Sequence, residues 1–203
     1  VRTYVEQVLD PISTPMEEKE MLTNEVLKAL RETEFFGLTI PQQYGGKGWS
    51  MMEWFPVLEE WAKAYAMIRL LAHCMNGIFW RPLYIYGNEE QKKRYLPKLA
   101  SGEIFAANCL TEPETGTGRN IVTTAKRDGK SYLINGRKWL ISFPFSQLYY
   151  IFAAAPEGIT AFLAEAGAPG LVVKAMPPMM GTLGVRHGEV IFENLRVPEE
   201  NIL

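Results

Sequence analysis

One stretch of the sequence reads Asn108-Cys109-Leu110-Thr111-Glu112-Pro113-Glu114-Thr115-Gly116-Thr117-Gly118, and a second reads Tyr132-Leu133-Ile134-Asn135-Gly136-Arg137-Lys138-Trp139-Leu140-Ile141-Ser142. The first joins an apolar strand to a hydroxyl-rich glycine turn, and the second is a strand that ends in another hydroxyl. Such segments present backbone N–H and side-chain O–H donors. Together they predict a surface that holds one flat polar ligand.

Short β-prone runs continue on both sides of these stretches. Turn signals such as Asp128-Gly129 and Asn135-Gly136 separate the runs. No helix-length segment lies between them, which favours an antiparallel barrel or sandwich over parallel βαβ units. The predicted strands are Ile104–Leu110, Ile121–Arg127, Ser131–Ile141, Leu148–Ala154, Gly158–Ala164, Gly170–Met176 and Glu189–Glu193.

The sequence before residue 104 has helical periodicity instead. Residues 17–36 are predicted as one helix because apolar side chains recur at helical spacing, at Met21, Val26, Leu27 and Leu30. A connector rich in Gly and Pro follows at 38–48, and further helices are predicted at 51–66, at 67–86 and from the N-cap Asn88 to about residue 101. We therefore predict a helical domain at residues 1–103 and a β domain at residues 104–203.

Composition narrows the class of ligand. The chain has 203 residues, of which 47% are hydrophobic, so it is expected to fold around a real core. The net charge of -2 gives no basic footprint, which argues against nucleic acid and anionic membrane surfaces as partners. Cys74 and Cys109 form no disulfide framework or metal-ligand spacing and are expected to be buried thiols. No apolar run is long enough to predict a membrane span. A small molecule is the expected ligand.

Ordered motifs run through the whole chain. They read, in order, Ile40-Pro41-Gln42-Gln43-Tyr44-Gly45-Gly46, Gly87-Asn88-Glu89-Glu90-Gln91-Lys92-Lys93-Arg94-Tyr95-Leu96-Pro97, Leu110-Thr111-Glu112-Pro113, Ile134-Asn135-Gly136-Arg137-Lys138, Gly158-Ile159-Thr160-Ala161-Phe162 and Val190-Ile191-Phe192-Glu193-Asn194-Leu195-Arg196-Val197-Pro198. This ordered set resembles the signatures of the acyl-CoA dehydrogenase family. The resemblance implies an α+β fold with an N-terminal all-helical domain followed by an antiparallel β-barrel domain, in agreement with the periodicity.

The resemblance also implies dehydrogenation of an acyl-CoA thioester to a 2,3-enoyl-CoA, with FAD as cofactor. A base takes the α proton while the β hydrogen leaves as hydride, so the protein must hold the flavin ring against the acyl chain in a dry slot. Thr111 and Ser142 would donate hydrogen bonds to the ring edge and stabilise the negative charge that grows there. The residues implied to line the flavin and substrate are Leu110, Thr111, Gly116, Thr117, Leu140 and Ser142.

Other parts of the family's site are expected outside residues 1–203. The resemblance implies a glutamate base in a C-terminal four-helix domain beyond Leu203, so no catalytic residue is assigned in this sequence and residues 1–203 alone are expected to be inactive. It also implies an acyl-CoA substrate, an electron-transfer flavoprotein or another electron acceptor, and a homo-oligomer when complete. We expect a cytoplasmic protein, or a mitochondrial matrix protein in a eukaryote.

The loops expected to face the ligand depart from the family's pattern. Gly116-Thr117-Gly118 stands where Gly-Ser-Asp is usual, and Leu140 stands where an aromatic residue is frequent. Phe143-Pro144-Phe145 replaces a turn that resembles Asn-Gly-Gly, and Arg186-His187-Gly188-Glu189 lacks the usual small hydroxyl residues. The two phenylalanines would occupy space that a flavin ring needs.

Two classes of function therefore remain open. The favoured one is a flavin-dependent acyl-CoA dehydrogenase, with an acyl-CoA oxidase as a close alternative, because the same flavin platform can pass electrons to oxygen. The other is a non-catalytic, flavin-poor relative or partner subunit that keeps the scaffold for assembly or acyl-CoA binding.

Three further polar residues have simpler interpretations. Glu112 and Glu114 together suggest a paired-carboxylate acid/base site, but Pro113 and the loop setting favour two solvated carboxylates. His187 lies in the loop that approaches the active site in the family, and a structural role is favoured for it over a functional one.

Overall fold

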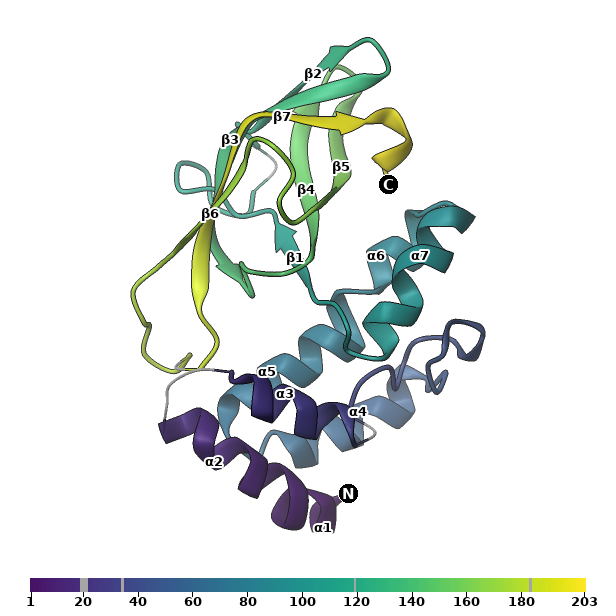
Figure 1. Cartoon of the computed structure of the whole chain (residues 1–203), viewed down its shortest axis with the longest axis vertical. Coiled ribbons are helices and arrows are strands. Elements are labelled where there is room, and N and C mark those ends of the chain that lie inside the picture. Colours follow the sequence, from purple (N-terminus) through teal and green to yellow (C-terminus); the bar gives the residue numbers. More distant parts are fainter. Residues whose placement is uncertain (19–21, 34, 119, 183) are drawn as a thin grey trace. The chain divides into compact units, whose positions relative to one another are not determined.

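The computed structural model describes residues 1–18, 22–33, 35–118, 120–182 and 184–203, with the side chains of residues 14 and 16–18 left aside (Figure 1). The chain forms two compact units. The first contains Val1–Ile104 together with Pro178–Val185, and the second contains Phe105–Pro177 together with Arg186–Leu203. The later segment belongs to the first unit partly through a hydrogen bond of 2.8 Å from the Leu22 N–H to the Gly184 carbonyl.

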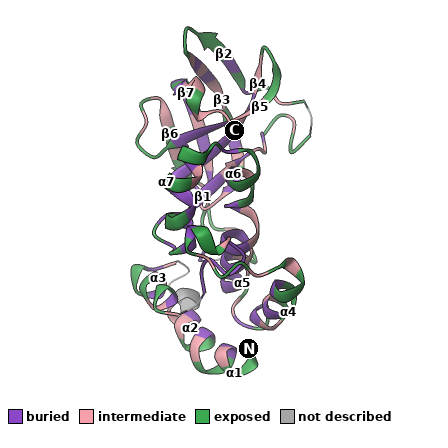
Figure 2. Cartoon of the chain, turned by 90° about the vertical axis from the view of Figure 1, so that its right-hand side faces the viewer, coloured by how far each residue is buried: buried purple, intermediate pink, exposed green. Residues whose placement is uncertain are grey.

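The first unit is helical, as predicted. Its elements are α1 (Arg2–Tyr4), the π-helical turn η1 (Val5–Leu9), α2 (Asp10–Glu18), α3 (Asn24–Arg31), the 3₁₀ turn η2 (Gln42–Tyr44), α4 (Met51–Trp61), α5 (Ala66–His73), the π-helical turn η3 (Cys74–Ile78), α6 (Arg81–Tyr86) and α7 (Glu89–Ala100). Buried and exposed residues share the helices α3 to α7, which marks these helices as amphipathic (Figure 2).

Two of the predicted helices are divided in the structure. The prediction of one helix over residues 17–36 is wrong, because α3 begins only after Thr23, whose hydroxyl caps it by accepting from the Val26 N–H at 3.3 Å. Met21, which contributed to that prediction, lies outside the described residues. The predicted helix over residues 67–86 is likewise interrupted after η3 and begins again with Pro82 in the first turn of α6. The predicted N-cap at Asn88 is confirmed as half of a capping box with Gln91.

A buried asparagine joins the connector after α3 to the helices of the first unit. Asn76 is fully buried in η3, where its side-chain oxygen accepts from the Leu38 N–H at 2.8 Å and its amide donates to the Phe35 carbonyl at 2.9 Å. The ring of Phe35 stacks on Trp61 of α4 with centroids 4.7 Å apart. The irregular backbone around residue 38 has no helix or sheet partner for these groups, so the Asn76 side chain satisfies them instead.

The second unit is one curled sheet, and every predicted strand is present. The strands are β1 (Ala106–Cys109), β2 (Thr124–Asp128), β3 (Ser131–Ser142), β4 (Leu148–Ala155), β5 (Gly158–Glu165), β6 (Leu171–Ala175) and β7 (His187–Pro198), followed by the 3₁₀ turn η4 (Glu199–Asn201). Their order is β1-β4-β2-β3-β7-β6, and β5 pairs with β4 off this path (Figure 1).

The strand directions differ from the prediction in one respect. The sheet is not wholly antiparallel, because β1 runs parallel to β4 along its whole length and β2 has a short parallel contact with β4 at Thr124 and Ala154. A parallel pair requires a long connection between its strands, and here the β2–β3 hairpin lies within the connection from β1 to β4. The other pairs, β2–β3, β3–β7, β4–β5 and β6–β7, are antiparallel.

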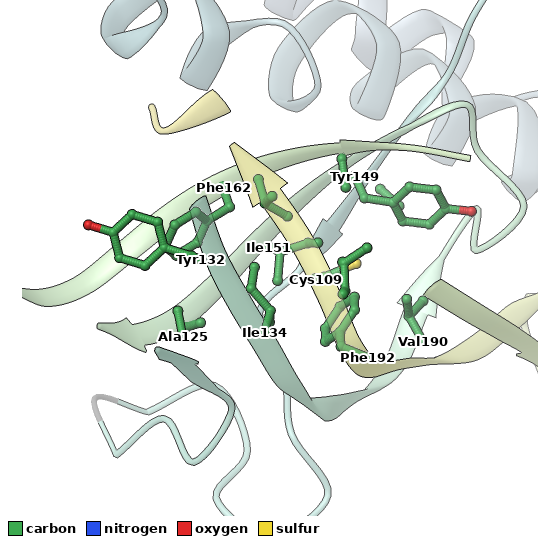
Figure 3. Packing of buried hydrophobic residues seen from close by; sticks show 14 of the residues in the cluster. Cys109, Ala125, Tyr132, Ile134, Tyr149, Ile151, Phe162, Val190 and Phe192 are labelled. Atoms are coloured by element: carbon green, nitrogen blue, oxygen red, sulfur yellow. The ribbon is translucent and has the colours of Figure 1, made fainter. Parts of the chain in front are cut away.

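The curled sheet encloses an apolar core to which most strands contribute (Figure 3). Tyr132 and Tyr149 lie at opposite ends of this cluster with their hydroxyls pointing away from it. The Tyr132 hydroxyl donates to Glu157 at 3.1 Å and the Tyr149 hydroxyl donates to the Pro144 carbonyl at 2.8 Å, so both polar atoms are satisfied at the edge of the core. Cys109 is fully buried in the cluster, and burial raises the pKa of its thiol to about 12.

Replacing Asn76 with alanine should destabilise the helical unit by about 2–4 kcal/mol, because it leaves the Leu38 N–H and the Phe35 carbonyl buried without partners. Urea unfolding followed by tryptophan fluorescence measures this, since Trp49, Trp54, Trp61 and Trp80 all lie in that unit. Asn24→Ala, an exposed change in α3, is the matched control and should be nearly neutral. Equal effects of the two substitutions would contradict the role of Asn76.

Candidate functional site

The two stretches singled out in the sequence lie side by side in the second unit. The Trp139 N–H donates to the Thr111 carbonyl at 2.8 Å, and the Lys138 ammonium donates to the Leu110 carbonyl at 3.2 Å. The segment that leaves β1 is thus hydrogen-bonded to the second half of β3. The half-buried Thr111 comes next to the half of β3 that ends at Ser142.

The glycine turn after Thr111 is a closed and exposed loop. Glu112 and Gly116 exchange backbone hydrogen bonds of 2.9 and 2.8 Å, and Gly116 adopts a φ of 67° that glycine tolerates without strain. Gly116 and Thr117 are both exposed. Glu114, also exposed, joins this turn to β3 through Arg137 at 2.9 Å. The structure therefore brings Leu110 and Thr111 against β3, whereas Gly116 and Thr117 lie farther out in the turn.

A buried ion pair holds this loop in place. Glu112 and Lys138 are 2.9 Å apart, and both side chains are fully buried. Glu112 also accepts hydrogen bonds from the Val122 N–H at 2.7 Å, the Thr123 N–H at 2.8 Å and the Thr115 hydroxyl at 2.9 Å. One carboxylate thus fastens both ends of the loop 112–123 to β3. The prediction that Glu112 is solvated is wrong, because the loop folds back over it; Glu114 is exposed as expected.

The buried pair keeps its charges because each oxygen of the carboxylate has donors. Burial by itself would raise the pKa of Glu112, but hydrogen bonding from Thr123, Val122 and Lys138 outweighs it and lowers the pKa to about 2. Burial lowers the pKa of Lys138, and the neighbouring Glu112 opposes that change. With these hydrogen bonds the pair fits a structural fastener better than an acid/base site, which needs a carboxyl that exchanges its proton near neutral pH.

A glycine lets the loop approach β3 closely. A Cβ at Gly136 would lie 2.8 Å from the Thr123 Cα and 2.5 Å from its hydroxyl oxygen, and the φ of Gly136 is 149°. A side chain at residue 136 would therefore clash with Thr123, whose N–H is one of the donors to Glu112. The Asn135-Gly136 pair, which the sequence suggested as a turn, instead lies within the long strand β3 at an irregularity in its pairing with β7.

The end of β3 has an unusual backbone. Its register against β7 shifts between Lys138 and Ile141, and within this bulge Leu140 has a φ of 56° with its side chain 42% exposed. Phe143, just beyond the strand, has a φ of 54°. Such values cost about 1–2 kcal/mol for residues other than glycine. The half-buried Phe143 ring lies against Phe105 with centroids 6.2 Å apart, and Phe145 is exposed.

Ser142 meets His187 across the sheet. The two residues are register partners in β3 and β7, and the Ser142 hydroxyl oxygen lies 3.1 Å from His187 Nε2. Burial lowers the pKa of His187, which favours the neutral ring. The structure therefore gives His187 a direct contact with a predicted ligand-binding hydroxyl, which sequence reasoning left as the less favoured possibility.

Sequence reasoning also missed Lys138 as the partner of Glu112. The available signal was the alternation of β3, in which Tyr132, Ile134 and Lys138 fall on one face at even spacing. Since Tyr132 and Ile134 are apolar core residues, a lysine on the same face requires a buried carboxylate nearby.

Comparisons with known proteins bear on this arrangement. Residues 1–103 match the family model of the acyl-CoA dehydrogenase N-terminal domain, and residues 107–195 match that of the acyl-CoA dehydrogenase middle domain. The chain belongs to the acyl-CoA dehydrogenase family. The family's helical part and curled sheet are the two units described above.

Individual members of the acyl-CoA dehydrogenase family are similar along the whole chain. An acyl-CoA dehydrogenase of Bacillus subtilis is 32% identical and a 3-(aryl)acrylate reductase of Clostridium sporogenes is 30% identical; each similarity covers 100% of this chain and 55% of the relative. A glutaryl-CoA dehydrogenase of Mycobacterium smegmatis, solved in complex with FADH2, matches with a TM-score of 0.91 at 25% identity, over 99% of this chain and 52% of that one. The chain thus spans about half the length of these relatives.

Breaking the buried pair should destabilise the β unit strongly. Glu112→Gln removes the charge that compensates the buried Lys138 and should cost about 3–5 kcal/mol. Amide hydrogen exchange at Trp139, whose N–H is bonded to Thr111, measures the effect together with urea unfolding. Glu114→Gln is the matched control: its pair with Arg137 is exposed and should contribute at most about 1 kcal/mol. Similar costs for both changes would show that the buried pair is not the fastener.

The contribution of Glu112 should also depend on pH with a definite sign. Its pKa lies near 2 in the folded chain against an ordinary value of 4.5, so the stabilisation is complete above about pH 4.5 and is lost as the pH falls toward 2. The difference in unfolding free energy between the native chain and Glu112→Gln should shrink over that interval. A difference that stays constant across it would contradict the ionised state of Glu112.

Proposed function

We propose that this chain supplies the helical and middle domains of a flavin-dependent acyl-CoA dehydrogenase. The observation that carries the proposal is the hydrogen bond between Trp139 and Thr111, because it aligns the segment of Thr111 with the strand that ends at Ser142. Two hydroxyl-bearing residues from separate parts of the sequence thereby lie on adjoining, hydrogen-bonded segments of the β unit. Membership of the acyl-CoA dehydrogenase family supports a flavin as the molecule that uses them.

The residues present fit a flavin ring. Thr111 and Ser142 are half-buried residues, so each keeps some accessible surface while being partly shielded from water. The exposed Leu140 side chain, two residues before Ser142, offers an apolar surface. At the glycine turn, nothing lies within 4 Å of the place where a Cβ of Gly116 would stand, so there is room beside the turn. The ring of Phe143 lies against Phe105, which gives that side chain a partner within the β unit.

FAD, when bound, would accept a hydride from the β carbon of an acyl-CoA thioester. The part assigned to this chain is to bind and orient that cofactor. The Thr111 and Ser142 hydroxyls would donate to acceptor atoms at the ring edge, where negative charge grows on reduction. Leu110 and Leu140 would exclude water from the bound flavin ring. Gly116 and Thr117 are also proposed to line the flavin.

The proton-abstracting base is proposed to lie outside residues 1–203. Three glutamates near the predicted flavin segments are held in ion pairs: Glu112 pairs with the buried Lys138, and Glu114 and Glu189 pair with Arg137. None of the three is assigned as the base. An electron-transfer flavoprotein or another acceptor is proposed to reoxidise the flavin, and a homo-oligomer is proposed for the complete protein. No helix among the described residues is long and apolar enough to cross a membrane.

A flavin-poor, non-catalytic relative is the second candidate. It is favoured by the left-handed conformations of Leu140 and Phe143, since these bulky residues stand in a bend where glycine or asparagine would be unstrained. Such a protein would keep the scaffold and lose the cofactor. An acyl-CoA oxidase would share the flavin site and differ in its electron acceptor.

Expression of the full coding sequence discriminates between these candidates. A purified protein with flavin absorbance that oxidises acyl-CoA with an artificial electron acceptor supports the dehydrogenase, and rapid reoxidation by oxygen would indicate the oxidase. A colourless protein that gains no flavin on incubation with FAD would overturn the proposal. Residues 1–203 alone should show no turnover, and measurable turnover would refute the placement of the base outside them.

Thr111→Val should weaken FAD binding or slow flavin reduction in the complete protein, by about 1–3 kcal/mol, because it leaves a buried acceptor of the ring without its donor. Fluorescence titration with FAD and stopped-flow reduction by acyl-CoA measure the two effects. Thr124→Val, the same change at an exposed position of β2, is the control and should alter neither. An unchanged affinity and rate in Thr111→Val would refute the role of Thr111.

A further inference from the structure

Which of Ser142 and His187 donates in their hydrogen bond depends on the groups around the histidine ring. The hydroxyl oxygen and Nε2 are 3.1 Å apart, and either atom can donate, depending on which nitrogen of the ring carries the proton. A hydroxyl has only one proton. If Ser142 donates it to His187, none remains for a ligand; if His187 donates instead, the Ser142 proton stays available.

The other ring nitrogen favours donation by His187. Nδ1 is buried and has no hydrogen-bond partner among the described residues. A proton on Nδ1 would therefore be a buried N–H without an acceptor, which folded proteins rarely tolerate. A proton on Nε2 has an acceptor at Ser142. The neutral form protonated at Nε2 satisfies every N–H of the ring, whereas the form protonated at Nδ1 does not.

The backbone holds both residues in place for this contact. Ser142 and His187 are partners in the β3–β7 ladder, and the Met176 N–H donates to the His187 carbonyl at 2.9 Å from the β6 side. Pro144 packs against Gly188, where a Cβ would lie only 2.5 Å from the Pro144 Cβ. The turn after Ser142 is thus seated directly on the residue that follows His187, which restricts how far the two side chains can separate.

We propose that His187 is a positioning residue, which donates its Nε2 proton to Ser142 and so leaves the Ser142 hydroxyl proton for an acceptor atom of the bound flavin. His187 acts only through Ser142 and needs no contact with the cofactor. The identity of the ligand rests on the proposed function, whereas the direction of the hydrogen bond does not. Replacing the usual small hydroxyl residues of this loop by histidine would in this way supply a fixed, neutral donor behind the serine.

The direction of the hydrogen bond is tested on the 203-residue chain without cofactor. Long-range ¹H–¹⁵N NMR distinguishes the two neutral forms of an imidazole, and the chain has only 2 histidines, so His73→Gln assigns the remaining signal to His187. At about pH 8 a histidine with an ordinary or lowered pKa is neutral. We expect protonation at Nε2. Protonation at Nδ1 would overturn the inference and would leave the proposed function untouched.

The consequence for the ligand is tested on the complete protein loaded with FAD. His187→Phe keeps an aromatic ring but removes the donor, and should weaken FAD binding about five- to tenfold, as Ser142→Ala should. The double variant should bind FAD no more weakly than Ser142→Ala alone, because His187 acts through the serine. His187→Gln offers an amide N–H near the position of Nε2 and should restore most of the affinity and the native flavin absorption spectrum.

Two outcomes of the FAD experiment would count against His187. Additive losses in the double variant would overturn the positioning role, and so would an unchanged affinity and spectrum in His187→Phe. If the native complete protein gains no flavin at all, the proposed function fails and the ligand named here fails with it, while the NMR result separately decides the direction of the hydrogen bond.

Discussion

The geometry of the β unit depends on one buried ion pair, Glu112 with Lys138. A carboxylate and an ammonium removed from water lose several kcal/mol of hydration each, and their attraction repays this only when the remaining donors and acceptors are satisfied. Here the carboxylate of Glu112 accepts further hydrogen bonds from the N–H groups of residues 122 and 123 and from the Thr115 hydroxyl. The ammonium of Lys138 also donates to the Leu110 carbonyl. The pair contributes specificity: a slip of the loop would leave two charges unpaired in an apolar interior.

That constraint carries outward to the candidate site. Once Glu112 is held under β3, Thr111 must lie beside Trp139, and the rest of β3 continues through its bulge to Ser142. The strain at Leu140 and Phe143 is tolerated because both sides of the bulge are anchored, by the buried lysine before it and by the seat of Pro144 on Gly188 after it. The loops that differ most from the family's pattern are therefore attached at both ends to fixed parts of the β unit.

The sequence predicted the type of each secondary-structure element far better than the element boundaries and the strand pairing. Alternation and turn residues located all the strands of the sheet, because side-chain burial on one face is a local signal. The break before α3 was missed because Thr23 competes with the helical periodicity by capping the next helix. The parallel pairing of β1 with β4 was missed because strand direction depends on which strands meet, and that is decided over long separations in sequence.

The sequence by itself determined the family, the order of a helical part and a β part, and the presence of hydroxyls at residues 111 and 142. These follow from residue types and spacing, which act through local backbone preference and periodic burial. Only the tertiary structure decided that Glu112 is buried rather than solvated, that Lys138 is its partner, and that His187 stands behind Ser142. Each of these is a contact between residues distant in sequence, where the cost of an unpaired buried charge or N–H selects one partner that no local pattern names.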